Sequence, residues 1–361
     1  MTQVKISVAQ SSYEVLIGPG SLGNAPCAIA GILGKKTGAL ISDWQVAPLF
    51  AQSLQEAFSR EGIRTTLITV PAGESSKTLE HAGLICDEMI QAGLDRHSFV
   101  IGLGGGVIGD LSGFVAAIYQ RGIPHVQIPT TLLSMVDSSI GGKTGVNAGS
   151  GKNLLGAVHH PSLVITDPDL LSTLPPREFK QGFAEIIKHA VIADADMFEK
   201  VAHAPGLPSF DAGEALAPLI QRNVETKARI IANDEDDRSG KRAILNFGHT
   251  IGHGIERAGK YQHFFHGEAV ALGMVAAARI STKRAGLTNR EAEAIEQVLA
   301  SYSLPTKLPG AINRQEILAA VMADKKFESG KVRFVVTPKI GSAYLSSEVT
   351  SEDIQDAIGQ L

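Results

Sequence analysis

The feature that most constrains the fold is a glycine-rich turn at residues 99–110, which read FVIGLGGGVIGD. An apolar run meets the consecutive glycines Gly104, Gly105 and Gly106, and a helical pattern follows from 107 to 119. This order predicts a strand, a tight turn and a helix start. Glycines let the backbone approach a ligand, and the first amides and the dipole of the helix favour a phosphate. The turn therefore predicts pyrophosphate binding. A structural turn that packs helix on strand is the alternative.

Length and composition indicate a two-domain protein and disfavour nucleic-acid-binding and membrane proteins. The chain has 361 residues, which predicts two domains, and a formal net charge of -4, which offers no electrostatic case for nucleic acid or an anionic membrane. The apolar run at 269–278 is too short to cross a bilayer, and residues 1–10 lack the apolar centre of a signal peptide. Cys27 and Cys86 are predicted to be buried thiols in a reducing compartment, with the cytoplasm as the default location.

Predicted strands and helices alternate in the first half of the chain. A hairpin is expected at 4–8 and 13–17, with further strands at 39–42, 65–70, 99–103, 123–128 and 163–166 and helices at 46–61 and 79–91. Such alternation favours a parallel sheet with helices on both faces. After 170 the pattern is almost wholly helical, at 177–193, 214–233, 250–258, 268–285, 290–301 and 314–323, before a late strand pair at 332–336 and 343–345. We therefore expect a Rossmann-like α/β nucleotide-binding domain at 1–168 and a mostly α-helical domain at 169–361, with a ligand cleft at their join.

Histidines in the second half indicate a metal site. In the stretch NFGHTIGHGIE at 246–256, His249 and His253 are spaced i,i+4 and share one helix face, which suits two imidazoles on one zinc ion. His266 follows on the next connection. Glu185, a charged position on an otherwise apolar helix face, is the best further ligand. Its alternative is an ordinary salt bridge to Lys188, one turn along the same helix.

A second group of candidates lies at residues 129–153, which are rich in Gly and Ser and are predicted to form a long loop. It carries Asp137, Lys143, Lys152 and Asn153, and lysines beside glycines suit a phosphate or carboxylate. A solvated loop is equally compatible. The remaining cations have weaker signals: Arg121 reads as a helix C-terminal cation, and Lys227, Arg242 and Lys325 as surface cations.

At these blocks the chain resembles a known family, the 3-dehydroquinate synthases of the sugar phosphate cyclase superfamily. The matching stretches are PAGESSK at 71–77, GGGVIGD at 104–110, RGIPHVQIPTTLL at 121–133, VDSSIGGKTGVN at 136–147, GKNLLGAVHHP at 151–161, TLPPREFKQGFAEIIKHA at 173–190, NFGHTIGHGIE at 246–256, HGEAVALGM at 266–274 and ADKKF at 323–327. They span nearly the whole chain in the family's order. The departures are mild: His159 and His160 stand where the family often has Phe or His and then Gln, and Gly254 replaces a common Ala.

The resemblance implies a set of site residues. The metal ligands, for Zn2+ or Co2+, would be Glu185, His249 and His266, with His253 facing substrate instead of the metal. NAD would contact Asp43, Gly73, Glu74, Lys77, Gly106, Val107, Ile108, Gly109, Asp110, Thr130, Thr131, Lys143, Lys152, Leu170, Leu171, Ser172 and Thr173. Substrate would meet Arg121, Asp137, Lys143, Asn153, Lys188, Lys227, Arg242, Asn246, His253 and Lys325. The resemblance also implies a homodimer in which Arg121 reaches across to the partner.

The implied activity is the conversion of 3-deoxy-D-arabino-heptulosonate 7-phosphate to 3-dehydroquinate and phosphate, in the shikimate pathway that leads to aromatic amino acids. It is a phosphate-eliminating lyase reaction that uses NAD catalytically. Three alternatives stay open: a metal- and NAD-dependent dehydrogenase of the glycerol or polyol type, a related sugar phosphate cyclase, and a catalytically silent nucleotide-binding protein. The filled metal triad argues against the last.

Overall fold

The computed structural model describes residues 1–8, 11–149, 151–204, 213–232, 234, 240–310, 312–323, 327–328 and 331–361. The chain divides into two compact units. Unit 1 consists of Met1–Leu174 and Ser209–Ala228, and unit 2 of Pro175–Pro208 and Arg229–Leu361. Unit 1 therefore includes most of helix α7, Gly213–Ala232, which the sequence pattern placed in the second domain.

A seven-stranded sheet forms the centre of unit 1, in the order β1-β2-β9-β6-β5-β3-β4. Its strands are β1 Thr2–Ser7, β2 Ser12–Ile17, β3 Gly38–Asp43, β4 Thr65–Val70, β5 Phe99–Gly104, β6 His125–Pro129 and β9 Leu163–Thr166. The hairpin β1–β2 is antiparallel, and every other neighbouring pair is parallel. The expected parallel sheet is thus present, with an antiparallel strand at one edge.

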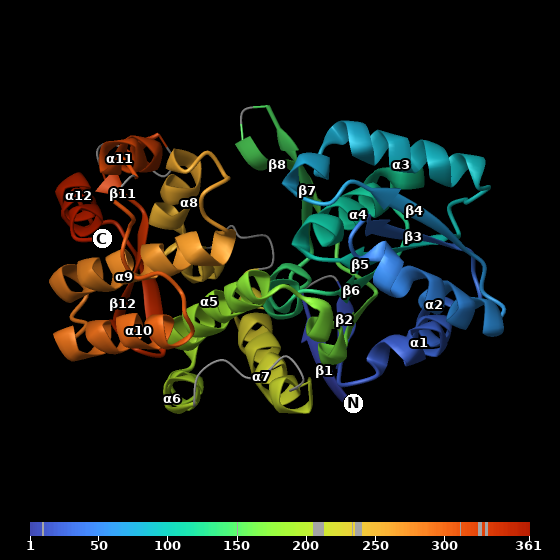
Figure 1. Cartoon of the computed structure of the whole chain (residues 1–361), viewed down its shortest axis with the longest axis horizontal. Helices are drawn as coiled ribbons and strands as arrows, with labels where there is room; N and C mark the ends of the chain where they lie inside the picture. Colours follow the sequence, from blue (N-terminus) through green and yellow to red (C-terminus); the bar gives the residue numbers. More distant parts are fainter. Residues whose placement is uncertain are drawn as a thin grey trace. The chain divides into compact units, whose positions relative to one another are not determined.

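Helices cover both faces of this sheet, with α1 and α2 on one side and α3 and α4 on the other (Figure 1). Their bounds are α1 Ala25–Leu33, α2 Ala47–Arg60, α3 Leu79–Gln91 and α4 Gly106–Ile118. Because both faces are covered, the central strands are rich in apolar residues, and every residue of β5 and β6 is buried. Ile41, Val100 and Leu111 belong to the core formed by β3, β5 and α4.

The glycine turn has the predicted strand–turn–helix form, and its glycines are required by close packing. A Cβ built on Gly104 would lie 2.7 Å from the Cβ of Ile108, and one on Gly109 would lie 2.8 Å from the Gln127 Oε1. Helix α4 therefore approaches β5 and β6 more closely than side chains at these positions would permit. The structural role that was the alternative interpretation of these glycines is present in the fold, whatever ligand the turn holds.

Two expectations for unit 1 were wrong. Residues 129–153 do not form one long loop, because they contain a π-helical turn, Ser134–Ser138, and the antiparallel hairpin of β7, Lys143–Ala148, and β8, Gly151–Val158. The Gly and Ser content masked the alternation of the hairpin. Cys27 is exposed on α1 and Cys86 is half-buried, although both thiols are free as expected.

Unit 2 is mostly helical. Its helices are α5 Pro176–Ala193, α6 Ala195–His203, α8 His249–Ala258, α9 His266–Arg284, α10 Asn289–Ser301, α11 Arg314–Met322 and α12 Ser351–Gly359. Its strands are β10 Phe327–Glu328, β11 Lys331–Val332, β12 Phe334–Lys339 and β13 Ser342–Ser346, in two antiparallel pairs. Helix α9 is buried along most of its length and packs against α5, α8, α10 and α12, so it is the central element of unit 2.

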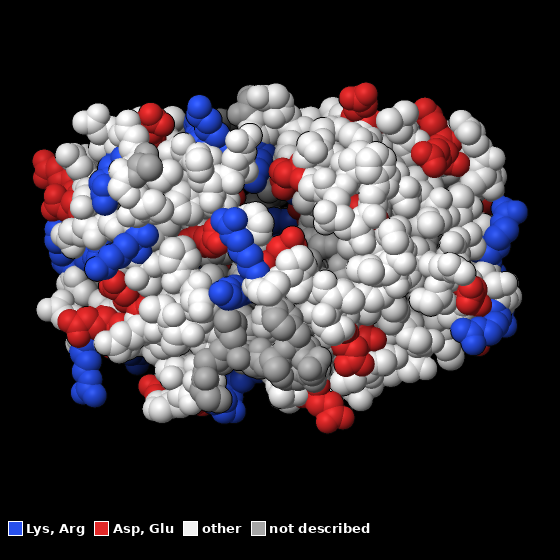
Figure 2. All heavy atoms as spheres, viewed as in Figure 1, with Lys and Arg blue, Asp and Glu red and all other residues white. Residues whose placement is uncertain are grey.

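The distribution of charged side chains agrees with the composition. On the face drawn in Figure 2, Lys and Arg side chains lie interspersed with Asp and Glu, as the balanced charge of the chain predicts. None of the helices in the described part of the chain has the length and apolar character needed to cross a membrane.

Candidate active site

Three side chains in unit 2 converge on one point with the chemistry of a metal site. Glu185 lies on α5, and His249 and His266 are the first residues of α8 and α9. The Glu185 Oε1 lies 3.6 Å from the His249 Nε2 and 3.5 Å from the His266 Nε2, and one ligand atom from each residue falls within 4.8 Å of the others. A carboxylate and two imidazoles at this spacing suit a tetrahedral Zn2+ or Co2+ ion that keeps an open position.

Close packing of two helices brings the histidines together. A Cβ built on Gly273 of α9 would lie 2.0 Å from the Gly248 carbonyl oxygen, and one on Gly252 of α8 would lie 3.1 Å from the Ala269 carbonyl oxygen. Gly248, at φ 79°, also supplies the left-handed residue that precedes α8. Small residues on both helices therefore let His249 reach the start of α9.

Glu185 lies among several titratable side chains that affect one another's charge. The carboxylate is fully buried and contacts the buried Lys188 ammonium three residues along α5. Burial, together with the nearby Lys188, holds the pKa of His249 well below its usual range. Burial opposes the charged form of His266 too, but the neighbouring carboxylates of Glu185 and Glu256 raise its pKa to about 10. Because a metal needs neutral imidazoles, its binding here would release a proton.

The spacing of His249 and His253 on one helix face does not by itself indicate which imidazoles meet Glu185. The group around Glu185 takes its second imidazole from His266, whereas His253 groups with Glu256 and His266. His253 is exposed, and its ring centroid lies 5.4 Å from that of His249 and 6.3 Å from that of His266. His253 shares a helix face with His249 and therefore lies near His249 and His266, but it is not grouped with the Glu185 carboxylate.

In unit 1 the residues expected to contact NAD follow the carboxyl ends of parallel strands. Asp43 ends β3, the Gly73–Lys77 region follows β4, the Gly106–Asp110 region follows β5, Thr130 and Thr131 follow β6, and Leu170 to Thr173 follow β9. The chain order reverses between β3 and β5, because β4 lies on the far side of β3. Ligands of open α/β sheets bind at such a reversal, outside the carboxyl ends of the strands.

A buried lysine organises this edge of the sheet. The Lys77 Nζ donates to the Asp110 Oδ2 at 2.5 Å and to the Asn153 Oδ1 at 2.5 Å. Burial raises the pKa of Asp110, and Lys77 opposes that rise. Asn147 extends the network, donating to the Glu74 carboxylate at 2.8 Å and accepting from the Asn153 amide at 3.0 Å. Residues expected to bind cofactor and substrate are thus joined through one ammonium group.

The second ion pair of unit 1 joins α7 to the π-helical turn. The Lys227 Nζ donates at 2.6 Å to both the side chain and the backbone carbonyl of Asp137. Lys227 is buried, so it is not the surface cation that its sequence context suggested. Arg242 is also buried, in a 3-10 helix that ends at Asn246, and its backbone amide donates to Asp234.

Three other expected site residues are exposed or half-buried, and one lies outside the described residues. Arg121, at φ 68°, and Lys143 are exposed, and Lys152 is half-buried on β8. Lys325 lies outside the described residues. Sequence reasoning did not single out Glu256. The spacing from His249 could have identified it, because residues seven positions apart are about two helical turns apart and lie on the same face of the helix.

Comparisons with known proteins cover nearly the whole chain. A family described as 3-dehydroquinate synthase N-terminal matches residues 67–181, and one described as 3-dehydroquinate synthase C-terminal matches residues 182–327. A 3-dehydroquinate synthase from Synechococcus sp. is 42% identical over 361 residues, covering 99% of this chain and 98% of the relative.

Solved structures give the same picture of the fold. A 2-deoxy-scyllo-inosose synthase complexed with carbaglucose-6-phosphate, NAD+ and Co2+ matches with TM-score 0.91 and 26% identity, over 99% of this chain and 100% of that one. A 2-epi-5-epi-valiolone synthase from Streptomyces hygroscopicus subsp. jinggangensis, with NAD+ and Zn2+ bound, matches with TM-score 0.86 and 29% identity over 98% of each chain. A probable glycerol dehydrogenase from Sinorhizobium meliloti, at TM-score 0.60 and 19% identity, shares the fold alone.

Proposed function

Since this chain belongs to the 3-dehydroquinate synthase family, we propose that it converts 3-deoxy-D-arabino-heptulosonate 7-phosphate to 3-dehydroquinate and phosphate. It is a carbon–oxygen lyase that uses NAD and a divalent metal. The observation that carries the proposal is the convergence of Glu185, His249 and His266. It is supported by the NAD+ and the Co2+ or Zn2+ in the solved relatives.

The donor set of this cluster fits the metal, because one carboxylate and two neutral imidazoles leave positions for substrate. When bound, the metal would supply Lewis acidity at the substrate's C5 hydroxyl, and NAD would supply a reversible hydride acceptor for C5 that is regenerated within the turnover. The chain's own residues hold the substrate while its C5 ketone makes the C6 proton acidic. Phosphate then leaves by elimination, the enol pyranose opens, and an intramolecular aldol reaction closes the carbocycle.

The cations have separate roles in this proposal, because the substrate carries both a phosphate and a carboxylate. The phosphate is held by Lys143, Asn153, Arg121 and Lys325. Arg242 holds the carboxylate, with Lys227 contributing. The ion pair between Lys227 and Asp137 keeps the Asp137 carboxylate oriented, and Lys77 does the same for the Asn153 amide.

The remaining members of the expected set contact substrate or cofactor. Lys188, Asn246 and His253 face the substrate. NAD would be held at the carboxyl edge of the sheet by the amides at the start of α4 and by the residues after β3, β4, β6 and β9. Lys143 and Lys152 add positive charge to this site.

An assay of inorganic phosphate with catalytic amounts of NAD tests the proposal. We expect phosphate release over many turnovers per NAD, no net NADH absorbance, and loss of activity on chelation that added Zn2+ or Co2+ reverses. Stoichiometric NADH from a simple polyol would instead establish a dehydrogenase. A related cyclase activity is favoured by the likeness to 2-deoxy-scyllo-inosose synthase, so phosphate release from a six-carbon sugar phosphate is measured in parallel.

We further propose a cytoplasmic homodimer in which Arg121 completes the partner's site. Its support is the exposed position of Arg121 on a left-handed turn and the free thiols of Cys27 and Cys86. Mixing Arg121→Ala with His249→Ala tests the arrangement, because heterodimers would contain one intact site. Partial recovery of activity on mixing supports it, whereas no recovery, with a dimer present by sedimentation, contradicts it.

A further inference from the structure

The third proposed ligand, His266, lies at a helix end, where the fold holds a residue less firmly than in the helix interior. It is the first residue of α9, where the backbone amides have no partners within the helix and the end is prone to fray. Its side chain is 31% exposed, so packing alone does not fix the ring. The direction of the imidazole must therefore be set by specific contacts around the start of α9.

Arg177 supplies the first of these contacts. Its Nε and Nη2 donate to the two carboxylate oxygens of Glu268 at 2.7 and 2.8 Å, and the Nη2 also donates to the His263 carbonyl at 3.2 Å. Its guanidinium lies 4.2 Å from the centre of the Phe265 ring. Glu268 in turn accepts from the Phe265 amide at 2.9 Å. One arginine thus holds residues on both sides of His266.

Gln181 makes the second contact, one helical turn further along α5. Its Oε1 accepts from the Gly267 amide at 3.1 Å, and a Cβ on Gly267 would lie 2.7 Å from the Gln181 Cα. Arg177, Gln181 and Glu185 follow one another at intervals of four residues, so they lie on one face of α5. The same face of α5 therefore carries the carboxylate ligand and two anchors for the helix that carries the imidazole ligand.

Glu256 makes the third contact, on the ring itself. Its Oε2 lies 3.6 Å from the His266 Nδ1, while the Nε2 on the other side of the ring faces Glu185 at 3.5 Å. Metal-bound histidines commonly direct their second nitrogen at a carboxylate, which fixes the tautomer and the ring plane. A buried carboxylate on α8 occupies that place here.

We propose that Arg177, Gln181 and Glu256 are positioning residues of the metal centre: the first two hold the start of α9 against α5, and the third orients the His266 ring. This inference rests on the proposed metal site and adds the residues that determine how tightly that site holds its ion. It also assigns the neighbouring group of His253, Glu256 and His266 to the support of that same ion and not to a second metal site.

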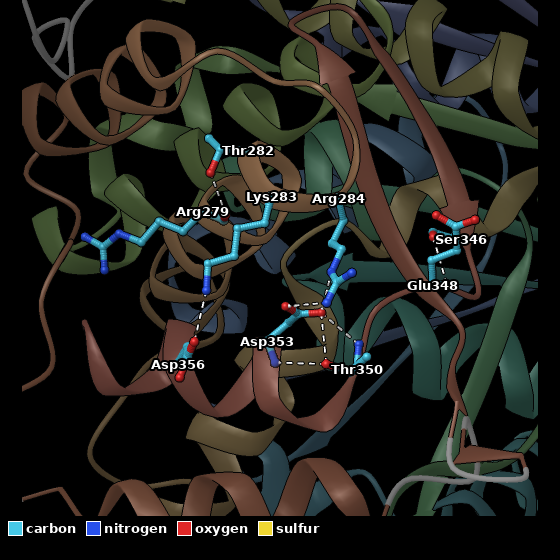
Figure 3. Close-up of polar contacts among 9 residues, drawn as sticks. All are labelled: Arg279, Thr282, Lys283, Arg284, Ser346, Glu348, Thr350, Asp353 and Asp356. Carbon is cyan, nitrogen blue, oxygen red and sulfur yellow. Dashed lines mark hydrogen bonds and ion pairs between the residues drawn. The ribbon is translucent and has the colours of Figure 1, made fainter.

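The opposite end of α9 offers a matched control. Arg284, the last residue of α9, donates to the two carboxylate oxygens of Asp353 on α12 at 2.7 and 3.1 Å, and Figure 3 shows the two side chains pointing toward each other. Asp353 also accepts from the Thr350 amide, as Glu268 does from the Phe265 amide. The two pairs share their chemistry and their capping role, but only one of them adjoins a proposed ligand.

The experiment compares Arg177→Gln, Gln181→Leu, Glu256→Leu and the control Arg284→Gln with the parent protein. Each is loaded with Co2+ or Zn2+, and the measurements are metal per chain, the rate of metal transfer to a chelator, the visible absorption of the Co2+ form, and thermal unfolding of the metal-free form. We expect one metal per chain in the parent. In the three test variants we expect metal affinity to fall about 10- to 100-fold and the Co2+ spectrum to change.

Arg284→Gln should leave transfer rate and spectrum unchanged, even where its unfolding temperature falls as far as that of Arg177→Gln. Arg177→Lys keeps the charge without the planar fork, and we expect it to restore only part of the affinity. Parent-like transfer rates in Arg177→Gln and Gln181→Leu, with one metal bound, would overturn the positioning proposal alone. A parent protein that binds no metal would overturn the proposed centre as well, and two metals per chain would refute the role of Glu256.

Discussion

Each unit contains a group of three histidines, and only one of the two groups has the chemistry of a metal site. In unit 1, the rings of His125 and His159 stack with centroids 5.0 Å apart, and His160 follows in the chain. In unit 2, the rings of His249 and His266 have centroids 5.3 Å apart. Ring spacing is therefore nearly the same in the two groups.

The surroundings of the rings differ. His249 and His266 face the buried carboxylate of Glu185, whereas His159 bonds through its Nε2 to the Ile123 carbonyl and His160 stacks on Tyr13. Burial, with the neighbouring His159 and His160, lowers the pKa of His125 to about 3, so that ring is neutral. The comparison teaches that a buried anion at which ligand atoms converge, and not the density of histidines, distinguishes a metal site from a packed core.

The largest expected effect is the loss of metal when a residue of the Glu185 group is replaced. Glu185→Gln and His249→Ala should each lose stoichiometric metal and reduce phosphate release to background, because few groups hold the ion. His125→Phe in unit 1 should keep one metal per chain. Metal content by elemental analysis of purified protein decides the matter, and a metal-free His125→Phe would show that the two groups are not as different as the geometry indicates.

The next effect concerns the cation beside Glu185. Lys188 is buried, so Lys188→Met removes the nearest positive charge from a buried carboxylate and should lower the free energy of unfolding of metal-free protein by about 3–5 kcal/mol. Added Zn2+ should restore part of that loss. The control is Lys283→Met, whose exposed pair with Asp356 at 2.9 Å is worth about 1 kcal/mol or less. Equal losses in the two variants, measured by denaturant unfolding with chelator present, would contradict the prediction.

A smaller effect separates the histidines of unit 2 from one another. His253→Ala should keep its metal while turnover falls about 100-fold, a typical contribution of a group that assists proton transfer or charge at a substrate. His266→Ala should lose metal instead. Parallel measurement of metal content and turnover tests the distinction, and a His253→Ala protein as poor in metal as His266→Ala would make the i,i+4 pair part of the site.

The smallest expected effect is a pH dependence of the folding stability, which arises because the buried His125 ring is neutral. The pKa of His125 is about 3 in the folded protein and about 6.5 when unfolded, so between these values the unfolded chain binds the extra proton. Its contribution to stability is complete above pH 6.5 and falls by about 1.4 kcal/mol per pH unit as the pH decreases toward 3.

His125→Phe should remove this component of the pH profile, and His97→Asn, at an exposed position, serves as control. Denaturant unfolding between pH 7.5 and 5 measures both, with an expected difference of about 2 kcal/mol at pH 5. Parallel profiles for His125→Phe and the parent would show that His125 is not buried in neutral form.

Local sequence patterns predicted most of the elements but missed helices α1 and α6, the short strands β10 and β11, and the hairpin of β7 and β8. The alternation of strands and helices in unit 1 and the helical periods of unit 2 are local properties, and their observed bounds differ from expectation by a few residues. The Gly and Ser content of residues 129–153 indicated a loop, yet the hydrogen bond between Lys77 and Asn153 holds part of that region beside the carboxyl edge of the sheet. This hydrogen bond joins residues that are 76 positions apart, so no local sequence pattern predicts it.

The glycine turn, the α/β and helical halves and, through the many matching blocks, the family could all be predicted from the sequence. These follow from local propensity and from residue order, which a chain carries before it folds. The burial of Lys227 and Arg242 and the hold of Arg177 on the start of α9 are visible only in the folded chain. Spacing alone left open which imidazoles meet Glu185, although the family resemblance implied His249 and His266. Helical spacing specifies which residues share a face, whereas the packing of one helix on another specifies what that face contacts.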